Sequence, residues 1–412
     1  MRVQCSTSDV KTQFSVFLQE FPQLCVSFAH QRIRQRCTGM YNLQVRHSSI
    51  SRMSYFQRVA ILLLGASLTI SSCGKNEDPA DAANRDSTQL SPAAIDTTKP
   101  AKAVEIDSSH VIFFRPTVGD TRRYRVSVTS TINMETTDSL MGGPSGKQNG
   151  RSMAEFVIKQ TVRAVNPDST VDLSFWIESA RVDQQADTSK ISYSSTNAAQ
   201  KTDVKFSHFT ALMGKEIKAK VSNHGDPRSI TGVEEVTEAL MKMTPDSLQK
   251  DQRVRAFRGQ QIQTVINQSI VRLLVFLPLR PVAKDSVWKD SFDQNIPVTQ
   301  EIMFPVTINS SEQVRGFEER AGKVVAILEA STVTTPKKMV IEQGQAKATL
   351  NSFKAINKGV TRVEDKTGQV VHRTLNDQRA YIFVLESKQQ PGRYYRTTNN
   401  SMENLIVELL PN

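Results

Sequence analysis

Cysteine is scarce in this sequence and is confined to its first part. The chain has four cysteines, and none follows Cys73. A domain built from the residues beyond Cys73 can form no disulfide and offers no further thiol for chemistry, so its stability must come from a packed core. Apolar residues are also few, at 38% of the chain, and the mean hydropathy is −0.36. Part of the chain is therefore expected to stay outside any core.

The positive charge does not indicate a nucleic-acid-binding surface. The chain carries a net charge of +11, but residues 1–72 contribute eight of the Lys and Arg residues and only two acidic ones. The rest of the chain then holds 44 basic and 39 acidic side chains, which is an ordinary mixed surface. We therefore expect no nucleic-acid partner.

No arrangement of residues predicts catalysis, a metal site or a cofactor. The four histidines beyond Cys73 lack zinc-ligand spacing; they are His110, His208, His224 and His372. The glycine-rich segment 142–150 departs from a phosphate-binding loop, since Met141 stands at the first glycine position and Gln148 replaces the required Ser or Thr. A long hairpin loop is the better interpretation, and a non-enzymatic protein is expected.

A secretory signal begins at Met53. Arg58 precedes an apolar stretch, Val59–Ile70, which ends in two small residues, Ser71 and Ser72. This order of charge, apolar run and small residues is typical of a signal peptide. Twelve residues are too few for a transmembrane helix, which needs about 20. The pattern predicts a signal peptide over 53–72 and cleavage between Ser72 and Cys73.

The residues around the cleavage point imply a lipid anchor. Ile70-Ser71-Ser72-Cys73 resembles the lipobox of bacterial lipoproteins. The resemblance implies that Cys73 carries a diacylglyceryl group and fatty acyl chains such as palmitate, and that it becomes the first mature residue. Such chains suffice for stable anchoring in a membrane of the cell envelope, here expected to be the outer membrane. The alternative is a buried free cysteine after an apolar helix.

The segments on either side of the signal are expected to lie outside the folded domain. Residues 1–52 fit best as an upstream extension, with translation starting at either Met1 or Met53. Residues 74–108 lack aromatics and contain three prolines, so they predict a disordered tether behind the anchored Cys73. The run Lys75–Asp78 resembles acidic surface-export signals, although a plain solvated linker is the better interpretation. A single domain is expected over 109–412.

Alternation of apolar and polar residues predicts a mainly β domain of the α+β class. In 124–132 the apolar residues fall on even positions, as in a half-buried strand. Asn166–Ser169 predicts a hairpin turn between two such segments. The pattern favours a large curved antiparallel sheet or half-barrel. Further strands are expected near 201–212, 215–222, 296–308, 312–318, 323–333, 347–356, 369–375, 379–387 and 402–410.

A helix pair is expected in the middle of the domain, as an insertion at about 233–275. Thr244-Pro245 predicts a helix start, and helical spacing of apolar residues continues to Leu274. A shorter helix is expected at 233–243. The basic residues of the long helix could face anionic lipid or simply water; they are Lys250, Arg253, Arg255, Arg258 and Arg272.

Two segments share the pattern R-P-x-x-x-D-[TS], at 115–121 and 280–286, and each precedes an aromatic residue. One turn type, with proline fixing φ and Asp capping the backbone, would explain the likeness. Duplication of a half-sheet and coincidence explain it equally.

Three segments, 113–126, 211–236 and 277–288, resemble an uncharacterised family of Bacteroidetes-type outer-membrane lipoproteins. The family more often has Gly where this chain has Lys284. The resemblance implies a fold and no activity. Long strands with a helical insertion are also similar to the lipoprotein-carrier half-barrels, in which a curved sheet closed by helices holds acyl chains; that likeness is one of fold.

These observations predict a membrane-anchored envelope lipoprotein that shelters a lipid or other apolar ligand, or binds an envelope protein. The alternative is a structural or scaffolding surface protein. Whether the concave side of the sheet is open or packed separates the two.

Overall fold

The protein is described here from a computed structural model. The residues that it describes are 102–106, 109–140, 145–187, 189–244, 246–297, 302–320 and 322–411. The predicted extension, the signal peptide and its cleavage residues Ser72 and Cys73 lie outside them.

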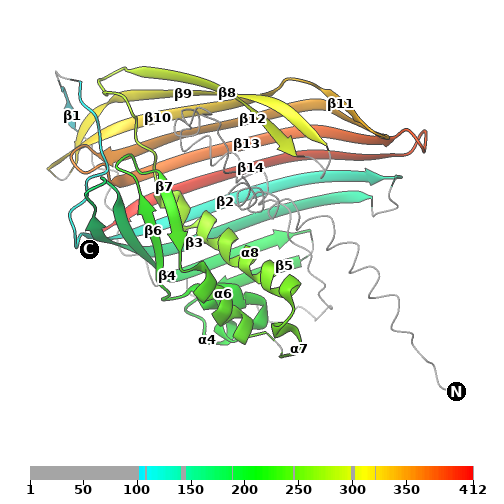
Figure 1. The fold of residues 1–412 in the computed structure, drawn as a ribbon, viewed down its shortest axis with the longest axis horizontal. Coiled ribbons are helices and arrows are strands. Elements are labelled where there is room, and N and C mark those ends of the chain that lie inside the picture. The colour runs from blue at the N-terminus through cyan, green and yellow to red at the C-terminus, as the bar shows by residue number, and fades with distance from the viewer. Residues whose placement is uncertain are drawn as a thin grey trace, which may run out of the picture.

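The described residues form a mainly β fold, with one 14-stranded sheet in which every strand pair is antiparallel (Figure 1). The strands are β1 (Lys102–Val104), β2 (Thr121–Asp138), β3 (Gly146–Val165), β4 (Val171–Ala186), β5 (Ser189–Ser194), β6 (Ile217–Val221), β7 (Pro227–Thr231), β8 (Val287–Pro297), β9 (Met303–Arg320), β10 (Lys323–Pro336), β11 (Val340–Gln343), β12 (Ala346–Glu364), β13 (Val370–Ser387) and β14 (Tyr394–Leu410). Their alternating sequences predicted this class correctly.

The order across the sheet is β1-β9-β10-β12-β13-β14-β2-β3-β4-β6-β7, and β5, β8 and β11 pair at its borders with β4, β9 and β12. Neighbours in this order are mostly neighbours in sequence. Two pairs are far apart in the chain: β1 pairs with β9 at one edge, and at the centre β14 pairs with the first long strand, β2, from Tyr395 opposite Asp138 to Leu410 opposite Arg123. The two halves of the chain thus meet in the middle of an open sheet.

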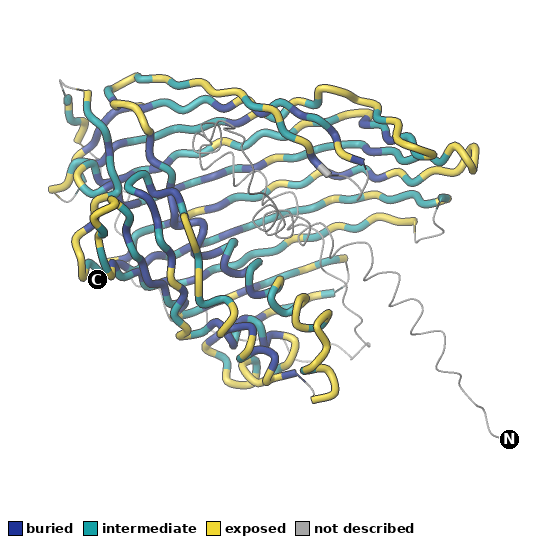
Figure 2. The backbone as a smooth tube through the Cα atoms, in the orientation of Figure 1, coloured by how far each residue is buried: buried dark blue, intermediate teal, exposed yellow. Residues whose placement is uncertain are grey.

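The helices occupy two segments, between β5 and β6 and between β7 and β8. They are α4 (Ala198–Lys201), the 3-10 helix η1 (Val204–Phe206), α5 (Ser207–Leu212), α6 (Val233–Lys242), α7 (Asp246–Gln249), α8 (Gln252–Gln268) and α9 (Ile270–Leu273). The α6 and α8 helices pack against each other. Buried residues concentrate at the end of the sheet near the helices, whereas exposed and half-buried ones dominate the other end (Figure 2).

Local sequence explains several of these elements. The predicted turn at Asn166–Ser169 is present between β3 and β4: the Ser169 amide donates to the Asn166 carbonyl over 2.9 Å, and Ser169 has φ of 60°. The predicted helix at 233–243 matches α6, whose first turn holds Glu234 and Glu235, where the helix dipole favours negative charge.

The strand predicted at 201–212 is wrong, because this segment is helical. Val204, Phe206 and His208 alternate as in a strand, but the Asp203 side chain accepts from the Lys205 amide and starts a helical turn. Phe206, Phe209 and Leu212 are then buried at helical spacing.

The long helix predicted from 244 is interrupted, and the helical region is larger than a pair. The Ser269 hydroxyl donates to the Val265 carbonyl over 2.6 Å, and the backbone leaves helical geometry at Ser269, which separates α8 from α9. Helices also precede β6, outside the predicted insertion at 233–275. Pro245 lies outside the described residues.

The tether prediction and the loop prediction each need a correction. Lys102–Val104, expected in the disordered tether, forms β1 and pairs with residues 317–319 of β9, whose edge β8 does not reach. Gly146–Gly150, expected in a hairpin loop, begins β3 and pairs with β2.

The two R-P-x-x-x-D-[TS] segments both form turns before strands. The residue with positive φ, however, stands one position later in the second segment than in the first. In the first, Gly119 has the positive φ (86°); in the second it is Asp285 (63°), which aligns with Asp120 rather than with Gly119. Lys284, which aligns with Gly119, therefore does not adopt the positive φ that Gly119 has in the first motif.

Candidate functional site

The two faces of the sheet differ in character. On β2 the even-numbered residues from Tyr124 to Val128 are buried, and most of their cross-strand partners on β3 and β14 are buried too, among them Phe156 and Val407. The face that carries these residues is called the inner face, and the opposite face the outer face.

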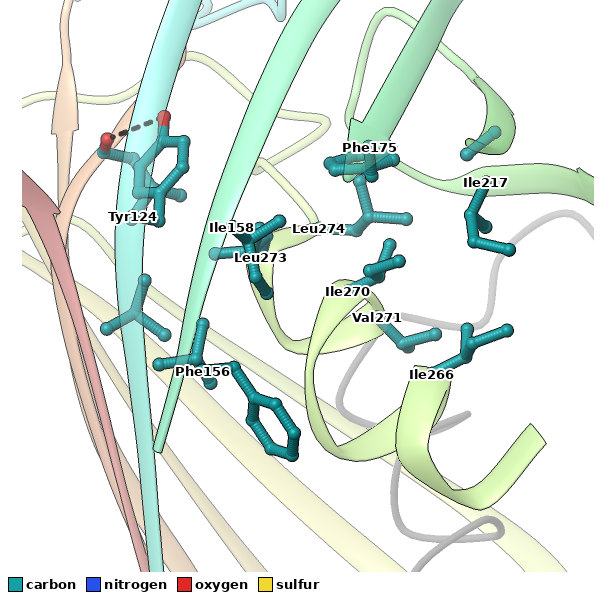
Figure 3. Close-up of a cluster of buried hydrophobic side chains, with 14 of the residues drawn as sticks. Tyr124, Phe156, Ile158, Phe175, Ile217, Ile266, Ile270, Val271, Leu273 and Leu274 are labelled. Atoms are coloured by element: carbon teal, nitrogen blue, oxygen red, sulfur yellow. Dashed lines mark hydrogen bonds between the residues drawn. The ribbon is translucent and has the colours of Figure 1, made fainter. Parts of the chain in front are cut away.

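At one end of the inner face, helices fill the space over the strands; this is the filled end. Phe156, Ile158 and Phe175 pack against Ile266 and Ile270 of α8 and α9 in one buried core (Figure 3). The Tyr124 hydroxyl donates to the Val370 carbonyl over 3.3 Å, and burial raises the pKa of Tyr124 to about 12. This end is a closed, structural core.

Beyond the filled end, a continuous polar row crosses the inner face; it is called the polar belt. Each of its residues stands directly opposite the next one on the neighbouring strand. The belt consists of Gln184, Ser152, Ser130, Glu403, Asp377, Asn357, Thr332, Ser310 and Asp290. A row of polar residues across nine strands separates the filled end from the rest of the inner face.

The two central carboxylates of the belt are matched by arginines. Arg272 of α9, itself buried, reaches Glu403 over 2.5 Å, and the Arg379 guanidinium contacts Asp377 over 2.6 Å. The fully buried Arg373 donates to the Arg272 carbonyl over 2.9 Å, which fixes α9 on the sheet. Further along the belt, Asn357 Oδ1 and Thr332 Oγ1 are buried and have no hydrogen-bond partner among the described residues.

Past the belt the inner face becomes apolar again, on β8 to β14. This surface is called the open-end patch. It consists of Phe292, Ile296, Ile302, Phe304, Val306, Ile308, Ala348, Leu350, Phe353, Tyr381, Phe383, Leu385 and Tyr395. Its described members come from strands and from Ile302 beside β9, and none comes from a helix.

A small, partly open hollow lies between the belt and the filled end. Trp288 and Glu312 of β8 and β9 line it from the sheet, and Phe276 lines it from the segment after α9. Burial, together with the nearby Asp290 carboxylate, raises the pKa of Glu312. This hollow could not be predicted from the sequence, because its lining residues lie far apart in the chain.

The histidines singled out from the sequence do not come together. His208 lies in α5 and not on a strand; burial lowers its pKa to about 4, helped by the positive Arg258. His110 contacts Asp365 over 2.6 Å, and burial lowers the pKa of His224 and of His372. No group of potential metal ligands occurs within the described residues.

The basic residues of the long predicted helix do not form one face. Arg272 is buried against Glu403, the Arg258 guanidinium donates to Gln261 over 3.0 Å, and Arg255 pairs with Glu238. Of the remaining two, Lys250 and Arg253, both are exposed. In the part of the chain that is described, no helix is long and apolar enough to cross a membrane.

Trp176 lies on the outer face of β4, where it is half-buried. The cations of Lys159 and Arg163 lie over its ring, at 5.6 and 5.1 Å from the ring centre. It lines neither the core nor the hollow.

Comparisons with solved structures give only weak likenesses. A structure titled "Lipid-protein interactions in lipovitellin" has a TM-score of 0.34 and 11% identity; the match covers 72% of this chain but only 26% of that one. Pseudomonas aeruginosa OccK5 (OpdH) has a TM-score of 0.19 and 7% identity, over 71% and 98% of the two chains. TM-scores this low do not indicate a shared fold.

Among curated proteins there is no match. A family model does match, over residues 168–370, and it includes two of the three segments that resemble an uncharacterised lipoprotein family, 211–236 and 277–288. Its description is "Family of unknown function (DUF6263)", so this part of the chain is an uncharacterised domain.

Proposed function

We propose that this chain is an exported lipoprotein that shelters a lipid or another apolar ligand on the inner face of its sheet, without catalysing a reaction. In this proposal the acylated Cys73 holds the protein in the cell envelope, at the outer membrane. Residues 74–101 then connect the anchor to β1.

The open-end patch carries the proposal. A sheet buries an apolar face against another layer, and at the filled end the helices provide that layer. At the open-end patch the described helices contribute no residue. Its rings are ordered against one another, since Phe304 meets Phe383 edge-on with ring centres 6.4 Å apart. The aliphatic residues of the patch and the rings of Phe304 and Phe383 are largely buried, so a ligand would contact the patch at its half-buried rings, such as those of Phe292, Phe353 and Tyr381.

The polar belt supports a ligand with a polar part. Asn357 Oδ1 and Thr332 Oγ1 are buried acceptors without a described partner, and such atoms are rare in native proteins. They lie beside the apolar patch, as an amphiphile with a head and a tail requires.

The test uses the acylated protein, extracted from membranes in mild detergent. Native mass spectrometry and solvent extraction separate ligands held by the fold from the acyl chains bonded to Cys73. The proposal expects a bound lipid or apolar molecule in excess of the detergent. Protein free of any such molecule, together with crosslinks from the inner face to another envelope protein, would instead support the scaffolding alternative.

A further inference from the structure

One charged residue interrupts an otherwise apolar row of the inner face. The row next to the polar belt, on its filled-end side, runs through directly opposed residues of nine strands. Its members are Val182, Ala154, Val128, Leu405, Leu375, Gly359, Ala330, Glu312 and Trp288. Placing a carboxylate among apolar side chains costs free energy. Stability of the fold therefore does not explain why this position is a glutamate.

The neighbours of Glu312 leave space in front of it. Ala330 stands opposite Glu312 and Gly359 opposite Ala330, so two small residues follow it across the sheet. The hollow lies over this place, with Trp288 on one side and Phe276 above. A Cβ at Gly359 would lie 2.2 Å from the Leu375 side chain and 2.8 Å from the Thr374 carbonyl oxygen, so glycine allows Leu375 to cover this position and the space at Glu312 lies on its other side, over Ala330.

No cation of the described residues neutralises Glu312. Its carboxylate has no described hydrogen bond or ion pair, and the charge nearest to it is the negative Asp290. The neighbouring Glu329 pairs with Arg315 over 2.8 Å, so that cation is engaged elsewhere. The raised pKa of Glu312 agrees with a buried carboxylate that lacks a counterion.

Two unpartnered acceptors stand in the polar belt beside the hollow, although they do not line it. Thr332 is two residues from Ala330 on β10, and Asn357 stands opposite Thr332. The unpartnered Asn357 Oδ1 accepts hydrogen bonds, and Thr332 Oγ1 can accept them too. With the carboxylate and the Trp288 ring, they match a ligand that carries a positive charge and N–H donors.

The strand that carries Glu312 leads from the hollow to the open-end patch. Ile308 and Val306 follow on the inner face of β9, four and six residues from Glu312. At about 3.4 Å per residue, they lie roughly 14 and 20 Å away. One acyl chain spans about 15 Å, half of the bilayer core, so a tail from the hollow reaches this patch.

We propose that the hollow binds the primary ammonium head of an amphiphile, with Glu312 as its counterion and the hydrocarbon tail along the inner face of β8 and β9. The inference rests on the proposed function, since it names the class of ligand that the inner face would hold.

The test reads the fluorescence of Trp288. The chain has two tryptophans, and Trp176→Phe on the outer face leaves Trp288 as the reporter. In this background, protein is titrated with dodecylammonium, dodecanoate and dodecyl maltoside below their micelle concentrations. The three probes share one tail and differ in the charge of the head.

Dodecylammonium is expected to bind at least about tenfold more tightly than the other two, and Glu312→Gln is expected to abolish that preference. The control Glu319→Gln removes an exposed carboxylate of the same strand and is expected to change nothing. Equal binding of all three probes, unchanged in Glu312→Gln, would overturn the head-group assignment alone. If no probe changes the emission of Trp288 and no lipid co-purifies, the proposed function fails with it.

Discussion

Arg122 on β2 and Glu364 on β12 form a two-pronged ion pair, with both N–O distances 3.0 Å, although β14 and β13 lie between their strands in the sheet. Lys323 and Thr367 also donate to the Glu364 carboxylate, over 2.7 and 2.9 Å. Both partners of the pair are buried. The ion pair therefore links the end of β12 to β2 at the filled end of the sheet.

This pair predicts a loss of stability in acid. Its hydrogen bonds lower the pKa of Glu364 from 4.5 to about 2, against the effect of burial. Because the folded pKa is below the unfolded one, the stabilisation is present above pH 4.5 and is lost as the pH falls toward 2. A shift of this size corresponds to about 3 kcal/mol. Urea unfolding of the wild-type protein and Glu364→Gln, between pH 2 and 7, measures it.

A double variant that removes both charges of the Arg122–Glu364 pair separates the effect of the pair from that of an unpaired charge. Glu364→Gln leaves the buried Arg122 with Asp120 as its remaining counterion, 3.3 Å away, and is expected to cost about 3 kcal/mol at pH 7. Arg122→Met combined with Glu364→Leu leaves neither charge and should cost less than the single change. A double variant as unstable as the sum of both single variants would contradict this account.

A second acid-sensitive step is expected in the helices. Burial lowers the pKa of His208 from 6.5 to about 4, so the unfolded chain takes up a proton first as the pH falls. Stability is thus lost between pH 6.5 and 4, by at most about 3 kcal/mol. The difference in unfolding free energy between wild type and His208→Gln should change across this window. A difference that stays constant with pH would exclude His208 as the cause.

Retention of an apolar ligand should depend on side chains of the inner face of β13 and not on those of its outer face. Phe383 lies in the open-end patch, and its neighbour Ile382 lies on the outer face of β13. Phe383→Glu is expected to remove most co-purifying apolar ligand, because it places a charge in the patch, whereas Ile382→Glu should retain it. Phe353→Glu, at a half-buried position of the same patch, repeats the test should Phe383→Glu fold poorly. Native mass spectrometry compares them; equal retention by all three would contradict the assignment.

Anchoring should depend on Cys73 alone among the cysteines. Cys73→Ala is expected to shift the expressed protein from the detergent phase to the aqueous phase on Triton X-114 partitioning, because both acyl attachment and cleavage need the thiol. Cys37→Ala is the control and should partition as the wild type does. Intact mass places the mature amino terminus, and a terminus upstream of Cys73 in the wild type would refute the lipobox assignment.

The carboxylate in the hollow should reduce stability at neutral pH. Because burial raises the pKa of Glu312, its charged form is less favourable in the folded state than in the unfolded one. Glu312→Gln should therefore raise the melting temperature at pH 7, and the gain should shrink as the pH falls and the carboxyl takes up its proton. A lower melting temperature at pH 7 would mean that Glu312 is a structural residue.

Several strands were predicted in pieces or too short at the points where the polar belt crosses them. The strands expected at 369–375 and 379–387 are one strand, β13, and the gap between them contains Asp377 of the belt. The gap between 296–308 and 312–318 contains Ser310, and the strand expected at 347–356 stops just before Asn357. Apolar alternation signals a strand only while one face is apolar, and the belt removes that signal.

The hollow could not be predicted for a different reason. Glu312 is unusual only in relation to Leu405, Leu375 and Ala330, its companions in a row across the sheet. Their positions depend on strand order and on bulges, such as the one between Leu350 and Ser352 that shifts the register of β12. A single sequence without pairing information contains neither.

The pairing of β14 with β2 sets the order in which the protein can be completed. β14 is synthesised after both of its neighbours and is inserted between them, so until then β2 and β13 both present bare hydrogen-bonding edges. Such edges are templates for aggregation. Loss of residues 394–410 would leave two incomplete sheets rather than one shortened domain. A nascent chain of this kind gains from being kept unfolded until β14 is available.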